Sequence, residues 1–166
     1  MSMIGEYFRV TAAELERSIE DPDWALDYID GIRDVEEEAE PSPAMARHFS
    51  TYQAWHLLDF LLKRSGFPVD VIHGEEAFEK ADDWGYGPPR YLTADRVRLG
   101  AEALSGLTYD QLLDGVDPAE LNTAEVYPLI WEDHASLEWA RDWFAGLTGY
   151  FKVAAREGHA VIIWLD

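Results

Sequence analysis

The segment Trp84–Thr93, with the sequence WGYGPPRYLT, brings one arginine together with three aromatic residues. Its two glycines permit backbone conformations that other residues avoid, and its two consecutive prolines hold the chain extended. We therefore expect a stiff, irregular loop that presents Trp84, Tyr86, Arg90 and Tyr91.

An arginine among aromatic rings could bind a carboxylate, a phosphate or a planar base, because its guanidinium donates paired hydrogen bonds and stacks on flat rings. The same residues could instead form a packing plug, with Arg90 donating to carbonyls or pairing with an acidic neighbour. We favour the structural interpretation. The glycines do not form a phosphate-binding loop, because their spacing differs and no Lys-Ser/Thr pair follows.

His56 and Asp59 are three residues apart in a predicted helix, so they could share a metal ion or orient a proton transfer. Two ligands do not make a metal site, and no H-E-x-x-H motif accompanies them. We therefore expect no metal and no cofactor. Asp59 and Lys63 have the spacing of a surface ion pair, and we favour a structural His56 at the edge of the core that is satisfied by a carbonyl.

Glu132, Asp133 and His134 could bind a divalent ion or act as acid and base. They also stand where a long helix is predicted to begin, and negative side chains are favourable at a helix N-terminus. We favour capping. Three further histidines are isolated in the sequence and are expected to be exposed or structural: His48, His73 and His159.

The charge of the chain limits its partners. Thirteen basic and 33 acidic side chains among 166 residues give a net charge of −20. This argues against nucleic acid, whose affinity for proteins comes largely from Lys and Arg, and against anionic membranes. It favours rapid encounter with a basic protein partner, although a generally acidic proteome would give the same composition.

The composition also predicts one domain in the cytoplasm. The length is typical of a single domain, here residues 1–166. The chain contains no cysteine, which excludes disulfides and thiol catalysis. Neither a signal peptide in Met1–Val10 nor an apolar run of about 18 residues is visible.

Hydrophobic periodicity and capping signals predict the elements. Strands are expected at Ile4–Val10 and Ala160–Leu165, the latter buried on both faces. A Thr11–Glu14 capping box begins a helix, and Asp21-Pro22 begins another. The remaining predictions are a loop at Glu36–Pro43, helices at Thr51–Ser65, Thr93–Gly106 and Asp133–Arg156, an extended Val69–His73 and a helical turn at Glu75–Ala81. The fold class is therefore α+β and mainly helical, with a small sheet that includes both terminal strands and is covered by helices.

Several pieces in this order resemble the YfbM-like proteins, a bacterial family of unknown function: MIGEYFRV before TAAELE, then YQAWHLLDFLL, WGYGPPRYLT and EGHAVIIWL. The resemblance spans essentially the whole chain and implies a compact, single-domain α+β fold. The family has no established activity, so the resemblance implies no catalytic residues.

No nucleophile elbow, Cys–His pair or paired-carboxylate motif is present. We therefore expect a non-catalytic binding protein, for example an immunity-type protein that blocks a basic toxin or nuclease. The alternative is a small enzyme or small-molecule binder, which requires Arg90, Tyr86 and Tyr91 to converge with His56 or Glu132 on one pocket. A homo-oligomer supported by exposed tryptophans is a third hypothesis.

Overall fold

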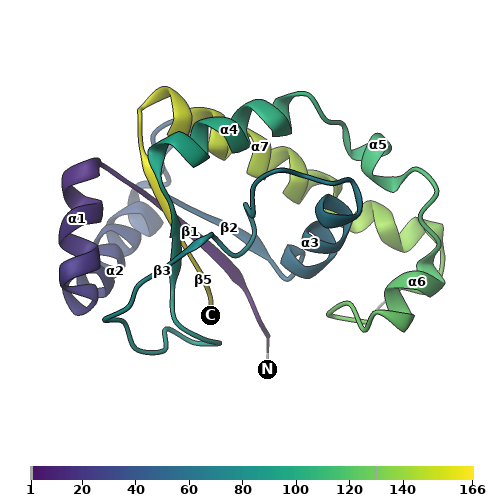
Figure 1. The fold of residues 1–166 in the computed structure, drawn as a ribbon, viewed down its shortest axis with the longest axis horizontal. Coiled ribbons are helices and arrows are strands. Elements are labelled where there is room, and N and C mark those ends of the chain that lie inside the picture. The colour runs from purple at the N-terminus through teal and green to yellow at the C-terminus, as the bar shows by residue number, and fades with distance from the viewer. Residues whose placement is uncertain (1, 130) are drawn as a thin grey trace.

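The computed structural model describes residues 2–129 and 131–166, and it is built around a five-stranded sheet (Figure 1). The strands are β1 (Gly5–Val10), β2 (His48–Tyr52), β3 (Glu76–Ala77), β4 (Arg90–Leu92) and β5 (Ala160–Leu165). Their order is β2-β1-β5-β4-β3, and each described pair is antiparallel. The two terminal strands are therefore direct neighbours at the centre of the sheet, with Gly5 opposite Leu165 and Val10 opposite Ala160.

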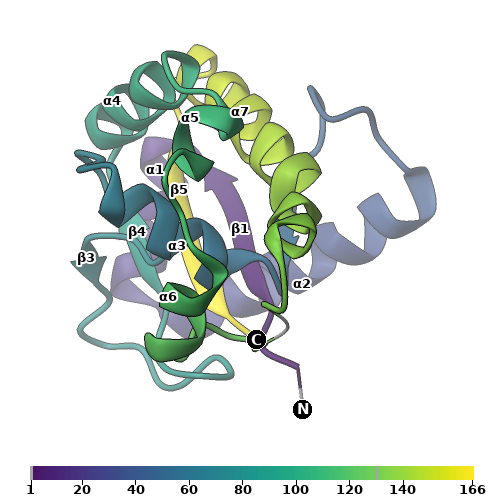
Figure 2. The ribbon, with the colours of Figure 1, turned by 90° about the vertical axis from the view of Figure 1, so that its right-hand side faces the viewer.

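Helices cover both faces of this sheet (Figures 1 and 2). One face carries α1 (Ala12–Glu20) and α2 (Pro22–Ala39). The other face carries most of the remaining helices: α3 (Trp55–Arg64), α4 (Ala94–Ser105), α5 (Tyr109–Leu113), α6 (Pro118–Thr123) and α7 (Arg141–Arg156). The α+β prediction is confirmed. None of the described helices combines the length and the hydrophobicity that a membrane-spanning helix needs.

The central strands are buried on both faces because side chains alternate along a strand. Tyr7 of β1 and Ile163 of β5 belong to the larger hydrophobic core under α3, α4 and α7. Phe8 and Ile162 belong to the smaller core under α1 and α2. This double burial was predicted for β5 and explains why its sequence does not alternate.

Short local signals begin the helices as predicted. The Thr11 hydroxyl accepts from the Glu14 amide while the Glu14 carboxylate accepts from the Thr11 amide. Asp21 caps α2, with Pro22 in the first turn. Thr93 precedes α4, although its side chain makes no capping hydrogen bond.

Five predictions of the bounds or the type of a segment are wrong. The loop predicted at Glu36–Pro43 begins only at Glu40, because α2 continues to Ala39 and the Glu36 carboxylate is satisfied by the amides of Arg47 and His48. The helix predicted from Thr51 begins at Trp55, because residues 48–52 pair with β1. Two segments predicted from weak local patterns also differ: Val69–His73 is turn rather than extended chain, and Glu75–Ala81 contains β3 rather than a helical turn. The helix predicted over Asp133–Arg156 is divided into a 3-10 helix, His134–Ala140, and α7.

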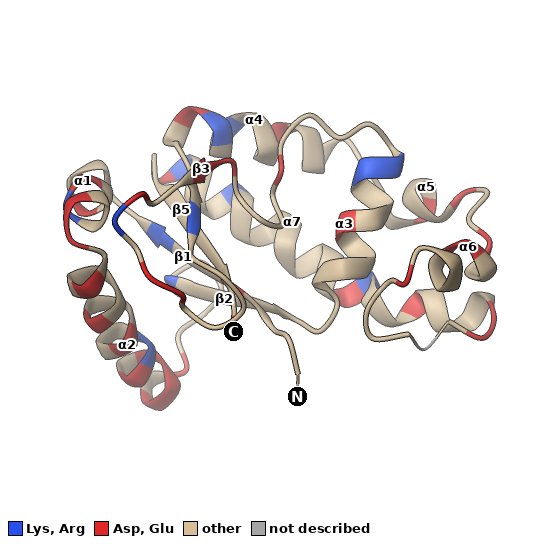
Figure 3. Cartoon of the chain, turned by 60° about the horizontal axis from the view of Figure 1, so that its bottom comes forward, with Lys and Arg blue, Asp and Glu red and all other residues tan. Residues whose placement is uncertain are grey.

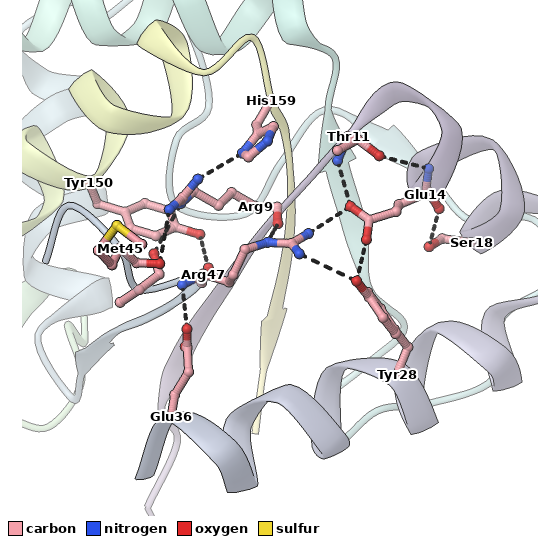
Figure 4. A network of polar contacts seen from close by, with 11 residues as sticks. Arg9, Thr11, Glu14, Ser18, Tyr28, Glu36, Met45, Arg47, Tyr150 and His159 are labelled. Atoms are coloured by element: carbon pink, nitrogen blue, oxygen red, sulfur yellow. Dashed lines mark hydrogen bonds and ion pairs between the residues drawn. The ribbon is translucent and has the colours of Figure 1, made fainter. Parts of the chain in front are cut away.

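Two arginines hold the loop between α2 and β2 against both layers (Figure 4). Arg9, which is 4% exposed, donates to the carbonyls of residues 44, 45 and 46 and contacts His159 Nδ1 at 2.9 Å. Arg47 donates to the Arg9 carbonyl and pairs with the Glu14 carboxylate at 2.7 Å. The Tyr150 hydroxyl of α7 donates to the Arg47 carbonyl at 2.7 Å. The loop is therefore held in place by contacts with β1, α1 and α7.

Candidate functional site

A small cavity lies beside the segment that the sequence singles out. It has a volume of about 240 Å³, and its lining includes Tyr86, Arg90, His73 and the end of β5. Arg90 is half-buried and donates to the carbonyls of Gly74 and Glu75 at 3.2 and 2.6 Å. Arg90 therefore makes the carbonyl contacts that the structural interpretation predicted, and a cavity adjoins it as well.

The aromatic residues of this segment do not converge. Residues 90–92 form β4, so consecutive side chains project to opposite faces of the sheet. Tyr91 packs on Phe78 and Trp84 packs on Trp164, both in the core beneath α1 and α2. Only Tyr86, which is 40% exposed, lies at the cavity with Arg90. The expectation of an irregular loop throughout this segment is therefore wrong at its C-terminal end.

His73 forms the centre of a charged cluster beside this cavity. Its Nδ1 atom lies 3.5 Å from a carboxylate oxygen of Asp59 and 3.5 Å from one of Asp70. The Lys63 ammonium contacts the other Asp59 oxygen at 2.9 Å. The predicted ion pair of Asp59 and Lys63 is present, but Asp59 is 8% exposed rather than a surface residue. The cluster joins α3 to the turn before β3.

The charges in this cluster are balanced. Hydrogen bonds to Asp59 and Asp70, against the opposing effect of burial, raise the pKa of His73 to about 9. Burial raises the pKa of each carboxyl, but their hydrogen bonds with His73 outweigh it and lower both values. At neutral pH, two carboxylates therefore face one imidazolium and one ammonium.

Asp59, Asp70 and His73 also have the spacing of a metal site, because their ligand atoms lie within 4.8 Å of one another. Among the residues that the structure describes, no other group has this spacing. A divalent ion there would have to displace the proton of His73, since a metal-bound imidazole is neutral. It would also compete with Lys63 for Asp59. The arrangement as it stands is a salt-bridge cluster.

His56 does not join this cluster through a hydrogen bond in the described part of the chain. Its Nδ1 atom accepts from the Tyr127 amide at 2.8 Å, and its ring stacks on Trp55. Burial lowers the pKa of His56. It is therefore a neutral residue at the edge of the core, satisfied by a backbone amide where a carbonyl was expected.

A family model described as a domain of unknown function (DUF1877) matches residues 1–164. The chain belongs to the DUF1877 family. Its structure is similar to the crystal structure of YfbM from Escherichia coli, a protein of unknown function, with a TM-score of 0.67, 18% identity, and 98% of this chain and 99% of that chain covered. At this identity the likeness shows the fold alone. Comparison with curated proteins gives no match.

The resemblance to YfbM-like proteins is confirmed, and the site of this DUF1877 member must be judged on its own residues. The sequence pattern did not pair Asp70 with His73, because it predicted an extended chain at Val69–His73. In an extended chain, side chains three residues apart point in opposite directions. A turn instead lets the Asp70 carboxylate accept from the His73 amide at 2.9 Å. The signal that was available is the Asp-x-x-His spacing, which suits an Asx turn.

The other histidines of this DUF1877 member have structural contacts or stand at the surface. Asp133 caps the 3-10 helix by accepting from the Ser136 amide, which confirms the capping interpretation, and Glu132 and His134 are exposed. His48 pairs with the buried Glu6 of β1.

Acidic residues are frequent along α2 (Figure 3), and five of them form a row that we call the acidic stripe. Its members are spaced by four and three residues in alternation, so they share one side of the helix, and all are exposed: Asp23, Asp27, Asp30, Asp34 and Glu37. Within residues 2–129 and 131–166, no salt bridge or side-chain hydrogen bond involves any of the five. The last turn of α2 contains no basic residue.

Proposed function

We propose that this protein is a non-catalytic binding protein that receives a basic protein partner on the acidic stripe of α2. The observation that carries the proposal is the alignment of five exposed, unpaired carboxylates on one helix face. They extend over about 21 Å at 1.5 Å per residue. A row of that length matches a helix or strand that presents several Lys or Arg side chains.

The stripe works against the stability of its own helix, which supports a role in binding. Like charges at i,i+3 and i,i+4 destabilise a helix by roughly 0.2–0.5 kcal/mol per pair. Carboxylates near the C-terminus also face the negative end of the helix dipole, where Glu37 stands. A basic partner would remove both penalties on binding.

Charge complementarity of this kind acts mainly on the rate of association and on the choice of partner. The net charge of −20 would attract a basic protein over a distance set by the salt concentration. A basic toxin or nuclease is one partner of suitable charge, which this protein would block in the manner of an immunity protein.

The test compares capture of proteins from the native lysate by two variants with equal charge. The stripe variant carries Asp27→Lys, Asp30→Lys and Asp34→Lys. The control carries Glu102→Lys, Glu120→Lys and Glu132→Lys, three exposed carboxylates on other elements. We expect wild type and control to capture the same basic protein at about 50 mM salt and to release it at about 500 mM, and the stripe variant to capture none. Equal capture by both variants would overturn the proposal.

A second candidate function is binding of a small carboxylate beside Arg90. The observation that favours it is the cavity of about 240 Å³, where the guanidinium of Arg90 and the imidazolium of His73 stand together in an acidic protein. This volume suits only a ligand of a few heavy atoms. Titration of acetate and malonate followed by amide NMR shifts tests it, with His73→Gln expected to abolish the shifts and His134→Gln to leave them unchanged. Shifts that spread over the whole surface would exclude it.

A further inference from the structure

Two cavities meet at His48, between α2, the loop after it and α7. The apolar one has a volume of about 630 Å³ and lies against the α7 face that carries Gly146, Gly149 and Tyr150. The polar one has a volume of about 480 Å³ and lies against the last turns of α2, which supply Arg33, Glu36, Glu37 and Glu40. Both cavities are lined by Pro41, Ala46 and His48, so they adjoin at these three residues, and we call the pair the groove, with an apolar and a polar end.

The two glycines of α7, Gly146 and Gly149, differ in how closely other residues pack against them. A Cβ atom on Gly146 would lie 3.0 Å from the Phe49 ring, so close packing accounts for that residue. A Cβ atom on Gly149 would meet nothing within 4 Å. Glycine inside a helix is less stable than alanine by about 1 kcal/mol, and packing does not account for Gly149. Its effect is to leave the apolar end of the groove open.

The polar end is suited to a positive charge. Glu36, Glu37 and Glu40 line it with a single guanidinium, that of Arg33, and Arg33 also lies 3.7 Å from the buried carboxylate of Glu6. The end of α2 adds the negative end of its helix dipole at the same place. Three lining carboxylates therefore outnumber the one guanidinium, and of the three, Glu36 already accepts from two backbone amides.

We propose that the groove binds a small organic cation, with an aromatic or alkyl body against Gly149 and an ammonium group among the glutamates of α2. Each of the two cavities has a volume in the range of small-molecule sites, which are mostly apolar with a few polar groups that orient the ligand. The loop that forms one wall is held by Arg9 and Arg47, so the groove is largely preformed. Glu37 belongs to both the groove and the acidic stripe, but this proposal does not require a protein partner at the stripe.

Tryptamine is the probe, because it joins an indole to an ammonium group. Its neutral and anionic counterparts are 3-ethylindole and indole-3-propionate. Isothermal titration calorimetry at about 150 mM salt should show saturable binding of tryptamine, at least about tenfold weaker binding of 3-ethylindole, and none of the anion. Replacement of both Glu37 and Glu40 by Gln should remove the preference for the cation and leave the binding of 3-ethylindole unchanged.

Gly149→Leu fills the apolar end without changing the charge, and it should abolish the binding of tryptamine. Thermal unfolding should show this variant folded at a temperature no lower than wild type, because leucine favours a helix more than glycine does. Gly31→Leu is the matched control, since Gly31 also stands in a helix with nothing within 4 Å of an added Cβ atom. It should bind tryptamine as wild type does.

The proposal is overturned if wild type shows no saturable binding of tryptamine up to about 10 mM, or if Gly149→Leu binds it as well as wild type. Non-specific attraction of amines to an acidic protein would give that second result. If Gly149→Leu instead prevents capture of a protein partner while tryptamine does not bind, the groove holds a side chain of that partner and the assignment to a small cation is wrong.

Discussion

Replacement of His73 by Gln should remove a pH dependence of stability that originates in its two carboxylate neighbours. The pKa of His73 is raised to about 9 from an ordinary value near 6.5. A raised pKa stabilises the folded state fully below pH 6.5, and this stabilisation is lost as the pH rises through 9. Without solvent screening, this shift in pKa lowers the free energy of unfolding by about 2.5 kcal/mol between pH 7 and 9.5. The imidazole is 32% exposed, so solvent screening reduces the expected loss to about 1–1.5 kcal/mol.

The assay is urea unfolding followed by tryptophan fluorescence at several values of pH from 6 to 9.5. The net charge makes self-repulsion grow with pH in every variant, so the difference between wild type and His73→Gln is the quantity to follow. That difference should be largest near pH 6 and close to zero at pH 9.5. His134→Gln, at an exposed histidine, should show no such trend. A constant difference between wild type and His73→Gln across this range would refute the electrostatic account of the cluster.

Three further predictions concern stability. Gly5→Ala should destabilise the fold by about 2 kcal/mol in chemical denaturation, because its Cβ atom would lie 2.3 Å from Thr51 Oγ1; an unchanged midpoint would contradict this contact. Hydrogen bonds outweigh burial and lower the pKa of Glu14 to about 2, so Glu14→Gln should cost roughly 2 kcal/mol at pH 7 and progressively less as the pH falls from 4.5 to 2; an equal loss at both ends would exclude this linkage. Asp30→Lys should raise stability by about 0.5 kcal/mol at low salt in thermal melts, and a lower melting temperature would show that the stripe does not repel itself.

The elements that could be predicted are those with a complete local signal. The capping box of Thr11 and the Asp21-Pro22 start each lie within four residues, and both operate as predicted. The terminal strands were visible because each is a short apolar run that needs cover on both faces. Their direct pairing is set by the fold as a whole, and the residues of the two strands do not specify it.

The elements that could not be predicted depend on distant partners. β3 and β4 span two and three residues, and each gains its strand geometry from a neighbouring strand rather than from its own residues. Thr51 was predicted to begin the α3 helix, yet it lies in β2, between two residues that pair with β1. At the candidate site, the same limit applies. The carbonyl contacts of Arg90 were predicted as one alternative, whereas its approach to His73 required knowledge of the turn between α3 and β3.

Several local rules of stability are broken around the loop that follows α2 and the two helices that flank it. Glu40 has a left-handed backbone with φ of 46°, which favours glycine or asparagine over glutamate. Gly149 weakens α7 without a packing reason, and the acidic stripe repels itself along α2. Departures from local preference that no contact compensates are expected where function and stability make different demands. Because these departures adjoin the groove and one face of α2, while the His73 cluster beside α3 is charge-balanced, the surface of α2 and its loop is where we expect this protein to bind.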